Sequence, residues 1–377
     1  MAYALANLPL ETLIGPVTRA TEVLVRLDER LARSPVRDGF VERQHFADAA
    51  AALWLEGELV HVEDLVLHDA HMDVRAPTHE LTRAHAVLRA RRQIFGRAPD
   101  WALGRDGLRQ LTGRGGAAVP AEGGREGEGA FGPDLEAGEL GEADEPDPLT
   151  EEFAAIDAVL ARSTRILEGG VMPAAGKPAS VTGLRPQNSL VYDLDWDEDA
   201  RLAEWQDVLA NTQELPAVLR AAILVDAWSE IDVLQHAAWL GPLLVAAVLR
   251  QEGLALSHLA SLHLGAKNIP RERRRARGRS DRLLAFVDAI QEAALAGLKE
   301  HDRLMLAKNQ MERRLRERRV SSKLSDLVEL VLSRPIVSTG MIQDRLKVSK
   351  QGALNLVGEL SLREMTGRGR FRAWGIV

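Results

Sequence analysis

Histidine and carboxylate side chains are concentrated between residues 61 and 85, in the segment HVEDLVLHDAHMDVRAPTHELTRAH. Imidazole nitrogens and carboxylate oxygens are ligands for zinc, manganese and iron. The central part of the segment could therefore form a metal site from His68, Asp69, His71 and Asp73. Their spacing matches no metal-binding motif, so we favour capping and hydrogen bonding between helices, with no metal and no cofactor. A metal-dependent enzyme at this cluster is the alternative.

A second group of polar side chains belongs to VSTGMIQDRLKVSKQGALNLVGEL, residues 337–360. The spacing of the apolar residues predicts two short helices joined by a tight turn at Lys347-Val348. Ser338 or Thr339 can cap the first helix, and Ser349 can cap the second. Two helices connected in this way have the form of a helix-turn-helix, in which the second helix lies in the major groove of DNA.

The second predicted helix has one face for packing and one for contact. Its apolar residues recur at helical spacing and should point inward: Ala353, Leu356, Val357 and Leu360. The opposite face, near the start of the helix, presents Lys350, Gln351, Leu354 and Asn355. Lysine, glutamine and asparagine form hydrogen bonds with base edges and phosphates. These four residues are therefore the candidate DNA-binding residues, and double-stranded DNA is the predicted partner.

The last segment, LREMTGRGRFRAWGIV at residues 362–377, predicts a β-hairpin with Gly367 and Gly369 at its tip. Three arginines surround the tip, namely Arg368, Arg370 and Arg372. A basic hairpin beside a helix-turn-helix is a wing, which commonly contacts the phosphate backbone or the minor groove. A winged helix can instead bind another protein, so a protein-interaction scaffold is a further alternative.

Positive charge is concentrated in the C-terminal part of the chain. The whole sequence has a formal charge of −7, but residues 261–377 hold 25 Lys and Arg against 13 Asp and Glu, a net of +12. Residues 1–260 therefore carry a net of −19. This asymmetry favours a polyanionic partner for the C-terminal part. An arginine run at 271–282 adds candidate phosphate contacts, which are Arg273, Arg274, Arg275 and Arg277.

The elements that must position these side chains are mostly helical. Residues 1–112 repeat apolar side chains at three- and four-residue spacing, which predicts an N-terminal helical region. Residues 113–148 are rich in Gly, Glu, Ala and Pro, which predicts a disordered acidic linker or insertion. Residues 149–330 predict a helical core, with a strongly apolar stretch broken near Gly241-Pro242. Residues 331–377 complete the chain as the predicted winged helix-turn-helix.

Composition narrows the class of protein further. The 377 residues include no cysteine, which excludes disulfides, zinc-thiolate sites and thiol nucleophiles. No run of about 18 apolar residues is present, so we expect no membrane span. The N-terminal sequence MAYALANLPLETL lacks the features of a secretory signal, so we expect a cytoplasmic protein.

The C-terminal sequence SRPIVSTGMIQDRLKVSKQGALNLVGELSLREMTGRGRFRAWGIV resembles the winged helix that follows the helical core of many Fic proteins, which are AMP-transferases. The segment AAALWLEGELVHVEDLVL, residues 50–67, is similar to the Fic segment that carries an inhibitory Ser-x-x-x-Glu-Gly motif. Glu56-Gly57 match that motif, but Ala52 occupies the serine position. The resemblance implies a mainly α fold, with a Fic-like helical core and a C-terminal winged helix-turn-helix.

The catalytic loop of Fic proteins, His-Pro-Phe-x-x-Gly-Asn-Gly-Arg-x-x-Arg, has no match in this chain. The corresponding region is EIDVLQHAAWLGPLLVAAVL, residues 230–249. The catalytic histidine would fall on Ile231 or Asp232, and Gly-Asn-Gly-Arg does not occur. The resemblance therefore implies a catalytically inactive core, and a function other than catalysis is favoured.

The phrases EDLVLHDAHMDVRAPTHELTRAH and TGRGRFRAWGI resemble an uncharacterised bacterial family, in which a domain of unknown function precedes a helix-turn-helix. This likeness covers most of the chain outside the predicted linker and brings no activity with it. Residues and resemblances together favour a DNA-binding transcriptional regulator. A homodimer is an open alternative to a monomer, and the sequence does not identify a small-molecule ligand.

Overall fold

The computed structural model describes residues 3, 5, 8–73, 76–113, 196–316, 322–365 and 372–376. These residues confirm the predicted mainly helical class, with little sheet. The predicted linker, apart from its first residue, lies outside the described residues, and so do Arg368 and Arg370 of the predicted wing. The predicted division of the chain into domains stays a prediction.

The helices form an N-terminal, a central and a C-terminal group along the chain. The N-terminal group contains α1 (Leu10–Ala32), α2 (Arg37–Glu56), α3 (Val62–Asp69), α4 (His79–Gly96), η1 (Trp101–Leu103) and α5 (Arg105–Leu111). The central group contains α7 (Glu198–Asn211), α8 (Ala217–Ile231), α9 (Leu240–Gln251), α10 (Leu262–Lys267), α11 (Arg271–Arg274) and α12 (Arg279–Arg316). The C-terminal group contains α13 (Ser322–Ser333), α14 (Thr339–Leu346) and α15 (Lys350–Leu360), with three short strands, β1 (Val337–Ser338), β2 (Arg363–Glu364) and β3 (Ala373–Gly375).

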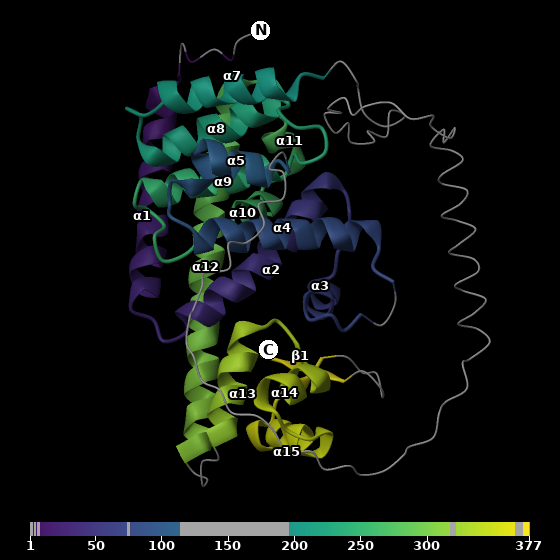
Figure 1. Ribbon diagram of the computed structural model, residues 1–377. Coiled ribbons are helices and arrows are strands. Elements are labelled where there is room, and N and C mark those ends of the chain that lie inside the picture. The colour runs from purple at the N-terminus through teal and green to yellow at the C-terminus, as the bar shows by residue number, and fades with distance from the viewer. Residues whose placement is uncertain are drawn as a thin grey trace, which may run out of the picture. The chain divides into compact units, whose positions relative to one another are not determined.

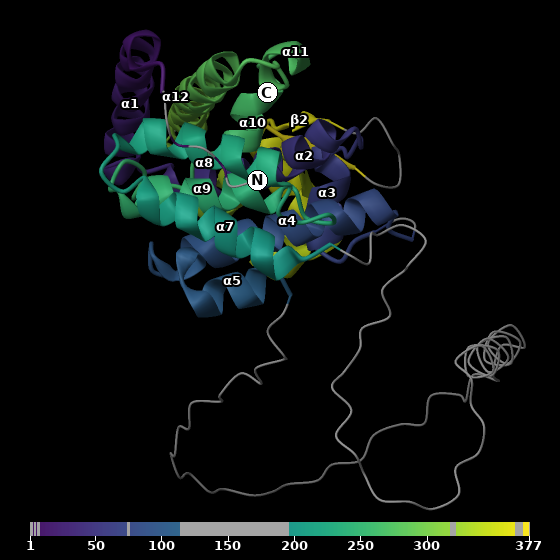
Figure 2. The same cartoon turned by 90° about the horizontal axis from the view of Figure 1, so that it is seen from above.

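The long helix α12 connects the helical core to the C-terminal group (Figure 1). Its 38 residues correspond to a length of about 57 Å, at a rise of about 1.5 Å per residue. Helices α1, α8 and α10 pack along it, and α13 contacts it as well. Figure 2 shows α1 and α12 side by side, with α4 and α5 on the other side of the bundle.

Two glycines allow neighbouring helices to approach α12 closely. A Cβ atom at Gly265 of α10 would lie 2.0 Å from the carbonyl oxygen of Ala289. A Cβ atom at Gly297 of α12 would lie 2.6 Å from a methyl carbon of Leu27 in α1. Because protein interiors are close-packed, a side chain at either glycine would push the helices apart. The glycines therefore fix the distance between α12 and its neighbours.

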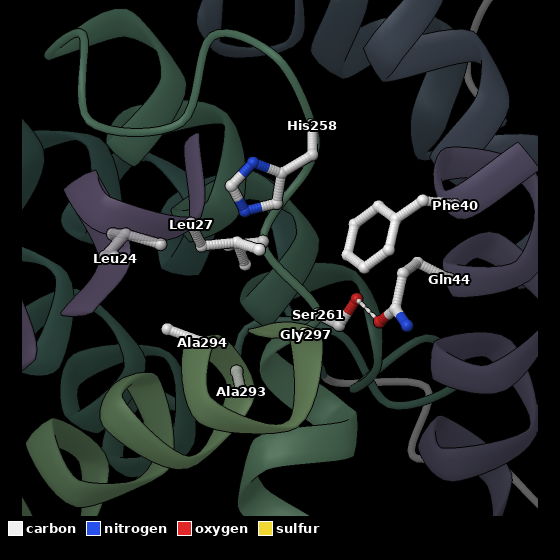
Figure 3. A pocket seen from close by; sticks show the side chains of 10 residues that line it. Leu24, Leu27, Phe40, Gln44, His258, Ser261, Ala293, Ala294 and Gly297 are labelled. Atoms are coloured by element: carbon white, nitrogen blue, oxygen red, sulfur yellow. Dashed lines mark hydrogen bonds between the residues drawn. The ribbon is translucent and has the colours of Figure 1, made fainter. Parts of the chain in front are cut away.

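The junction of α1, α2 and α12 encloses only a very small cavity (Figure 3). Leu24 and Leu27 from α1, and Phe40 and Gln44 from α2, are among the residues that line a volume of about 10 Å³. Ser261 donates a hydrogen bond to Oε1 of Gln44 at 2.9 Å within this lining. Such a volume holds about one water molecule, so this junction is a packed part of the core and not a ligand site.

A fully buried ion pair links α2 to α4. Asp48 and Arg91 are both completely buried and form this pair. Asp48 also accepts a hydrogen bond from the backbone N–H of Leu264 at 2.8 Å and faces Nδ1 of His263 at 2.9 Å, which adds α10 to the network. Burial alone would raise the pKa of Asp48, but Arg91 and His263 outweigh it and lower the pKa. The carboxylate is therefore ionised and paired within the core.

The apolar stretch of the central group is interrupted earlier than the sequence predicts. The predicted break near Gly241-Pro242 is present but lies a few residues earlier, because residues 232–239 are the non-helical segment and α9 begins at Leu240. Asp232 ends α8 with a left-handed backbone, at a φ of 55°. Pro242 lies in the first turn of α9, where the backbone N–H groups have no partner within the helix. Proline at this position is therefore compatible with the start of a helix.

Candidate nucleic-acid interface

The two short helices α14 and α15 have the predicted caps and turn. The Ser338 hydroxyl accepts a hydrogen bond from the backbone N–H of Met341, and the Ser349 hydroxyl accepts one from Gly352, each at 3.2 Å. Lys347 turns the chain between the helices with a left-handed backbone, at a φ of 51°. The predicted caps and turn of the helix-turn-helix are confirmed.

A three-stranded antiparallel sheet in the order β1-β3-β2 accompanies these helices. Val337 of β1 pairs with Trp374 of β3, and Arg363 of β2 pairs with Gly375. Strands β2 and β3 are the two sides of the predicted hairpin. The strands of that hairpin are therefore present, whereas its tip lies outside the part of the chain that the structure describes.

The two faces of α15 differ in burial. The four apolar residues predicted to point inward, Ala353, Leu356, Val357 and Leu360, are all buried. Lys350, Gln351 and Asn355 are exposed, and the side-chain amide of Gln351 donates to Oδ1 of Asn355 at 3.0 Å. Leu354 is partly buried beside the hydrophobic core, so it is less outward-facing than the sequence predicts. The N-terminal end of α15 therefore exposes three polar side chains.

Arg372, the one predicted wing arginine within the described residues, is engaged within the hairpin. Its guanidinium donates to a carboxylate oxygen of Glu364 at 2.7 and 3.0 Å. It also lies over the ring of Trp374, with 5.3 Å between Cζ and the ring centroid. The hydrogen bonds to Glu364 raise the pKa of Arg372. This arginine therefore joins β2 to β3, which is a role that the sequence does not reveal.

Arginines of the helical core hold the ends of the C-terminal helices. The buried Arg43 of α2 donates from Nε to the carbonyl oxygen of Leu332 at 2.7 Å and from Nη2 to that of Val331 at 2.8 Å. Arg314 of α12 donates to the carbonyl oxygen of Leu360, the last residue of α15, at 2.5 Å. The last carbonyls of a helix have no partner within the helix, so these arginines satisfy acceptors that would otherwise be unpaired.

A third arginine contact involves β3. Arg303 of α12 donates to the carbonyl oxygen of Ile376 at 2.8 Å, just after the strand. Its other donors form hydrogen bonds with Glu300 at 2.7 and 2.8 Å, which raises the pKa of Arg303. We call Arg43, Arg303 and Arg314 the core arginines. They fix the helix-turn-helix to the helical core at three separate points.

Asp69, from the predicted histidine and carboxylate cluster, joins the core to the C-terminal group. It accepts hydrogen bonds from Arg92 of α4 at 2.6 Å and from Arg334, which follows α13, at 2.9 Å. The two guanidinium carbons lie 5.2 and 5.1 Å from the ring centroid of Phe46. Burial alone would raise the pKa of Asp69, but Arg92 and Arg334 together lower it. Asp69 is thus an ionised bridge between two arginines.

Two of the remaining members of the cluster, His68 and Asp73, pair with each other. Nδ1 of His68 lies 2.9 Å from Asp73, and Nε2 of His85 lies 3.4 Å from Asp69. The rings of His68 and His85 meet edge to face, with centroids 4.8 Å apart. His71 has a left-handed backbone, at a φ of 54°. Among the described residues, no three histidine, aspartate or glutamate side chains converge in a way that could hold a metal ion.

The arginine run does not lie beside the exposed polar end of α15. Arg273 pairs with Asp288 at 2.7 Å, Arg275 and Arg277 are exposed, and Arg274 is partly buried. Helix α11 precedes α12, whereas α13 to α15 follow it, and the two groups lie near opposite ends of that helix (Figure 1). Phosphate contacts by the run stay a prediction, and they would require DNA that extends well beyond the helix-turn-helix.

Comparisons with known proteins match two parts of the chain. The family described as "Protein of unknown function (DUF1612)" matches residues 190–316, and the family described as "HTH DNA binding domain" matches residues 324–377. The second match covers α13, α14, α15 and the sheet. These matches bear out the predicted domain of unknown function and the predicted helix-turn-helix.

A similarity covers the whole chain as well. The chain is 50% identical over 389 residues to the uncharacterized protein y4cF of Sinorhizobium fredii, and the match covers 100% of both proteins. The name of that relative states no activity. In the described part of the chain, no helix is both long enough and apolar enough to cross a membrane.

We predict that Asp69→Asn loosens the contact between the core and the C-terminal group in a pH-dependent way. At neutral pH the change should lower the free energy of unfolding by about 1–3 kcal/mol, because Arg92 and Arg334 lose a charged acceptor. The pKa of native Asp69 lies below its ordinary value of 3.8, so its contribution is complete above that value and is lost as the pH falls through the native pKa. The difference between wild type and variant, measured by denaturant unfolding, should therefore shrink below about pH 4.

Asp302→Asn is the matched control for this measurement. Asp302 pairs with Arg30 on the exposed surface, at 3.0 Å, so its loss should cost at most about 1 kcal/mol. A difference between wild type and Asp69→Asn that stays constant down to pH 3 would contradict the role assigned to the Asp69 carboxylate.

Proposed function

The chain belongs to the family of the Sinorhizobium fredii protein y4cF, and from its helix-turn-helix match and the exposed polar face of α15 we propose that it is a sequence-specific DNA-binding protein and a transcriptional regulator. The observation that carries the proposal is the arrangement of α15. One face is buried, and Lys350, Gln351 and Asn355 are exposed at the N-terminal end of the other. That is the part of a recognition helix that meets base edges in the major groove.

The exposed side chains of α15 suit different parts of DNA. Asn355 and Gln351 can each offer an amide that pairs with adenine in the major groove, and their mutual hydrogen bond orients both amides before DNA is bound. Lys350 suits a phosphate or a guanine. Leu354, being partly buried, has its apolar surface beside these amides, where a thymine methyl group would lie.

The hairpin formed by β2 and β3 supports a wing in this proposal. Arg372 links the two strands through Glu364, so it stiffens the base of the hairpin. We assign the contacts with phosphates or the minor groove to Arg368 and Arg370, at the predicted tip. We propose that the protein acts on cytoplasmic DNA as a monomer or a homodimer, and a bound site with two-fold symmetry would identify the homodimer.

We also propose that the helical core is Fic-like but does not transfer AMP. The position of the Fic catalytic histidine falls on Ile231, which is buried, or on Asp232, which ends α8, and neither register contains Gly-Asn-Gly-Arg. Without that loop the core lacks the groups that bind the nucleotide phosphates. Incubation of the protein with labelled ATP and candidate targets should leave every protein unlabelled, and labelling by the wild-type chain would overturn this part of the proposal.

The DNA-binding proposal is tested with the full-length protein and a site selected from a random DNA library. Gln351→Ala or Asn355→Ala should each weaken binding to the selected site by about 1–3 kcal/mol and relax the preference for one base. The double change Arg368→Ala and Arg370→Ala should weaken binding to all sequences alike. It should also reduce the slope of log affinity against log salt by up to about 2. Fluorescence anisotropy measures both effects.

Arg109→Ala is the control for loss of positive charge. Arg109 is exposed on α5, away from the helix-turn-helix, so its replacement should leave the affinity and the salt slope unchanged. If the full-length protein binds no member of the library even at low salt, the C-terminal group is a protein-interaction surface and the regulator proposal fails.

A further inference from the structure

An apolar cavity with one arginine lies where α2, α8, α9, α10 and α11 meet the N-terminal part of α12. Its volume is about 140 Å³. Leu55, Val225, Pro242, Phe286 and Ile290 supply apolar lining from four of these elements. An apolar cavity of about 150 Å³ accommodates benzene in another protein, so this cavity has room for one aromatic ring or a short branched chain.

The polar groups in the lining are few, and most of them are already engaged. His263 faces Asp48 with Nδ1 at 2.9 Å and the carbonyl oxygen of Trp239 with Nε2 at 3.1 Å, so both ring nitrogens are occupied. The hydroxyl of Ser229 donates to the carbonyl oxygen of Val225 at 3.1 Å and keeps only its capacity to accept. Neither group is available to select a ligand by charge.

Arg274 is the remaining polar group of the lining, and its guanidinium has spare donors. Nε donates to the carbonyl oxygen of Ile269 at 3.0 Å, but within the described residues no carboxylate forms an ion pair with Arg274. Burial lowers the pKa of Arg274, and the neighbouring Arg275 and Arg271 lower it further, against a smaller opposing effect of Glu272. A bound anion beside Arg274 would offset this repulsion.

We propose that this cavity binds a small organic monocarboxylate, with its ring or branched chain among the apolar side chains and its carboxylate on Arg274. A guanidinium and a carboxylate form paired, charge-assisted hydrogen bonds, which suits this single cation. A phosphorylated ligand fits less well, because the cavity lining contains one cationic side chain for two or more negative charges. An uncharged ligand would leave the guanidinium unpaired.

Two other hollows of the described structure are poorer candidates. The junction in Figure 3 has room for about one water molecule. The open groove between α1 and the start of α8 is large, about 590 Å³, but its lining has no cationic side chain and includes Glu22. Of these three hollows, the Arg274 cavity is the one that has both a mostly apolar lining and a cationic side chain.

Occupancy of the cavity should alter DNA affinity, a step that rests on the proposed DNA-binding function. Leu55 belongs to α2, which also carries Arg43, and Phe286 and Ile290 belong to α12, which also carries Arg303 and Arg314. The walls of the cavity are therefore continuous with the helices that hold the helix-turn-helix. A ligand changes DNA affinity to the extent that it prefers one arrangement of these helices.

Benzoate is the probe, and the uncharged benzamide, of nearly the same shape, is its control. Calorimetric titration of the full chain without DNA should show benzoate binding at least about tenfold more tightly than benzamide, the equivalent of about 1.4 kcal/mol. Arg274→Gln should remove that advantage, and Arg274→Lys should restore part of it. Arg109→Gln, which removes an exposed arginine of α5 outside the lining, should leave benzoate binding unchanged.

Equal affinity for the two probes, no binding at millimolar benzoate, or benzoate binding that survives Arg274→Gln would overturn the site. The comparison of the two probes uses the wild-type chain, so it does not depend on how well any variant folds. The regulatory step is measured separately, as the change in DNA affinity on adding benzoate. Unchanged affinity would overturn that step alone, whereas a chain that binds benzoate but no DNA would contradict the proposed function and not the site.

Discussion

The placement of the helix-turn-helix depends on the buried guanidinium of Arg43. Burial lowers its pKa to about 10, so it remains protonated at neutral pH. A buried charge is costly unless hydrogen bonds and a partner offset it. Arg43 meets that condition through the last carbonyls of α13 and through Glu300, 3.9 Å away. The carbonyl end of a helix carries partial negative charge, so α13 is held where the core supplies positive charge.

Helices α2 and α12 therefore belong to the helical core and also hold the helix-turn-helix. Helix α2 carries Arg43 and the buried Asp48, and α12 carries Arg303 and Arg314. The hydrophobic core is continuous from α1 to α15. The helix-turn-helix is consequently attached by side chains as well as by the polypeptide, and a change in the spacing of α2 and α12 reaches it directly. A rigid attachment of this kind presents α15 in one orientation to DNA.

The sequence predicted local features well and tertiary features poorly. The caps at Ser338 and Ser349 and the buried face of α15 follow from neighbouring residues, and the structure confirms them. The break lies a few residues before Gly241-Pro242, because proline is also compatible with the first turn of a helix. For Asp69 the sequence favoured hydrogen bonding between helices, but it did not identify the partner Arg334, which is 265 residues away in the chain. Pairings of that kind depend on the fold, so one sequence does not reveal them.

The cavity at Arg274 illustrates the same limit. An arginine run indicates nucleic acid when only its charge is considered, and the sequence placed Arg273 to Arg277 among the phosphate contacts. The structure separates members of that run, because Arg273 pairs with Asp288 while Arg274 turns toward an apolar lining. Arg273 and Arg274 are neighbouring arginines of α11, yet their surroundings differ. The difference comes from the packing of α10 and α12.

The central claim is that the core arginines hold α15 in a fixed position relative to the helical core. The chain has no cysteine, so spin labels can be attached at Arg89→Cys on α4 and Gly358→Cys on α15, both exposed positions. Pulsed electron spin resonance should give one narrow distribution of distances between the labels, and Arg43→Met should broaden it. A broad distribution in the chain that retains Arg43 would contradict the claim and show that the helix-turn-helix is a loosely tethered module.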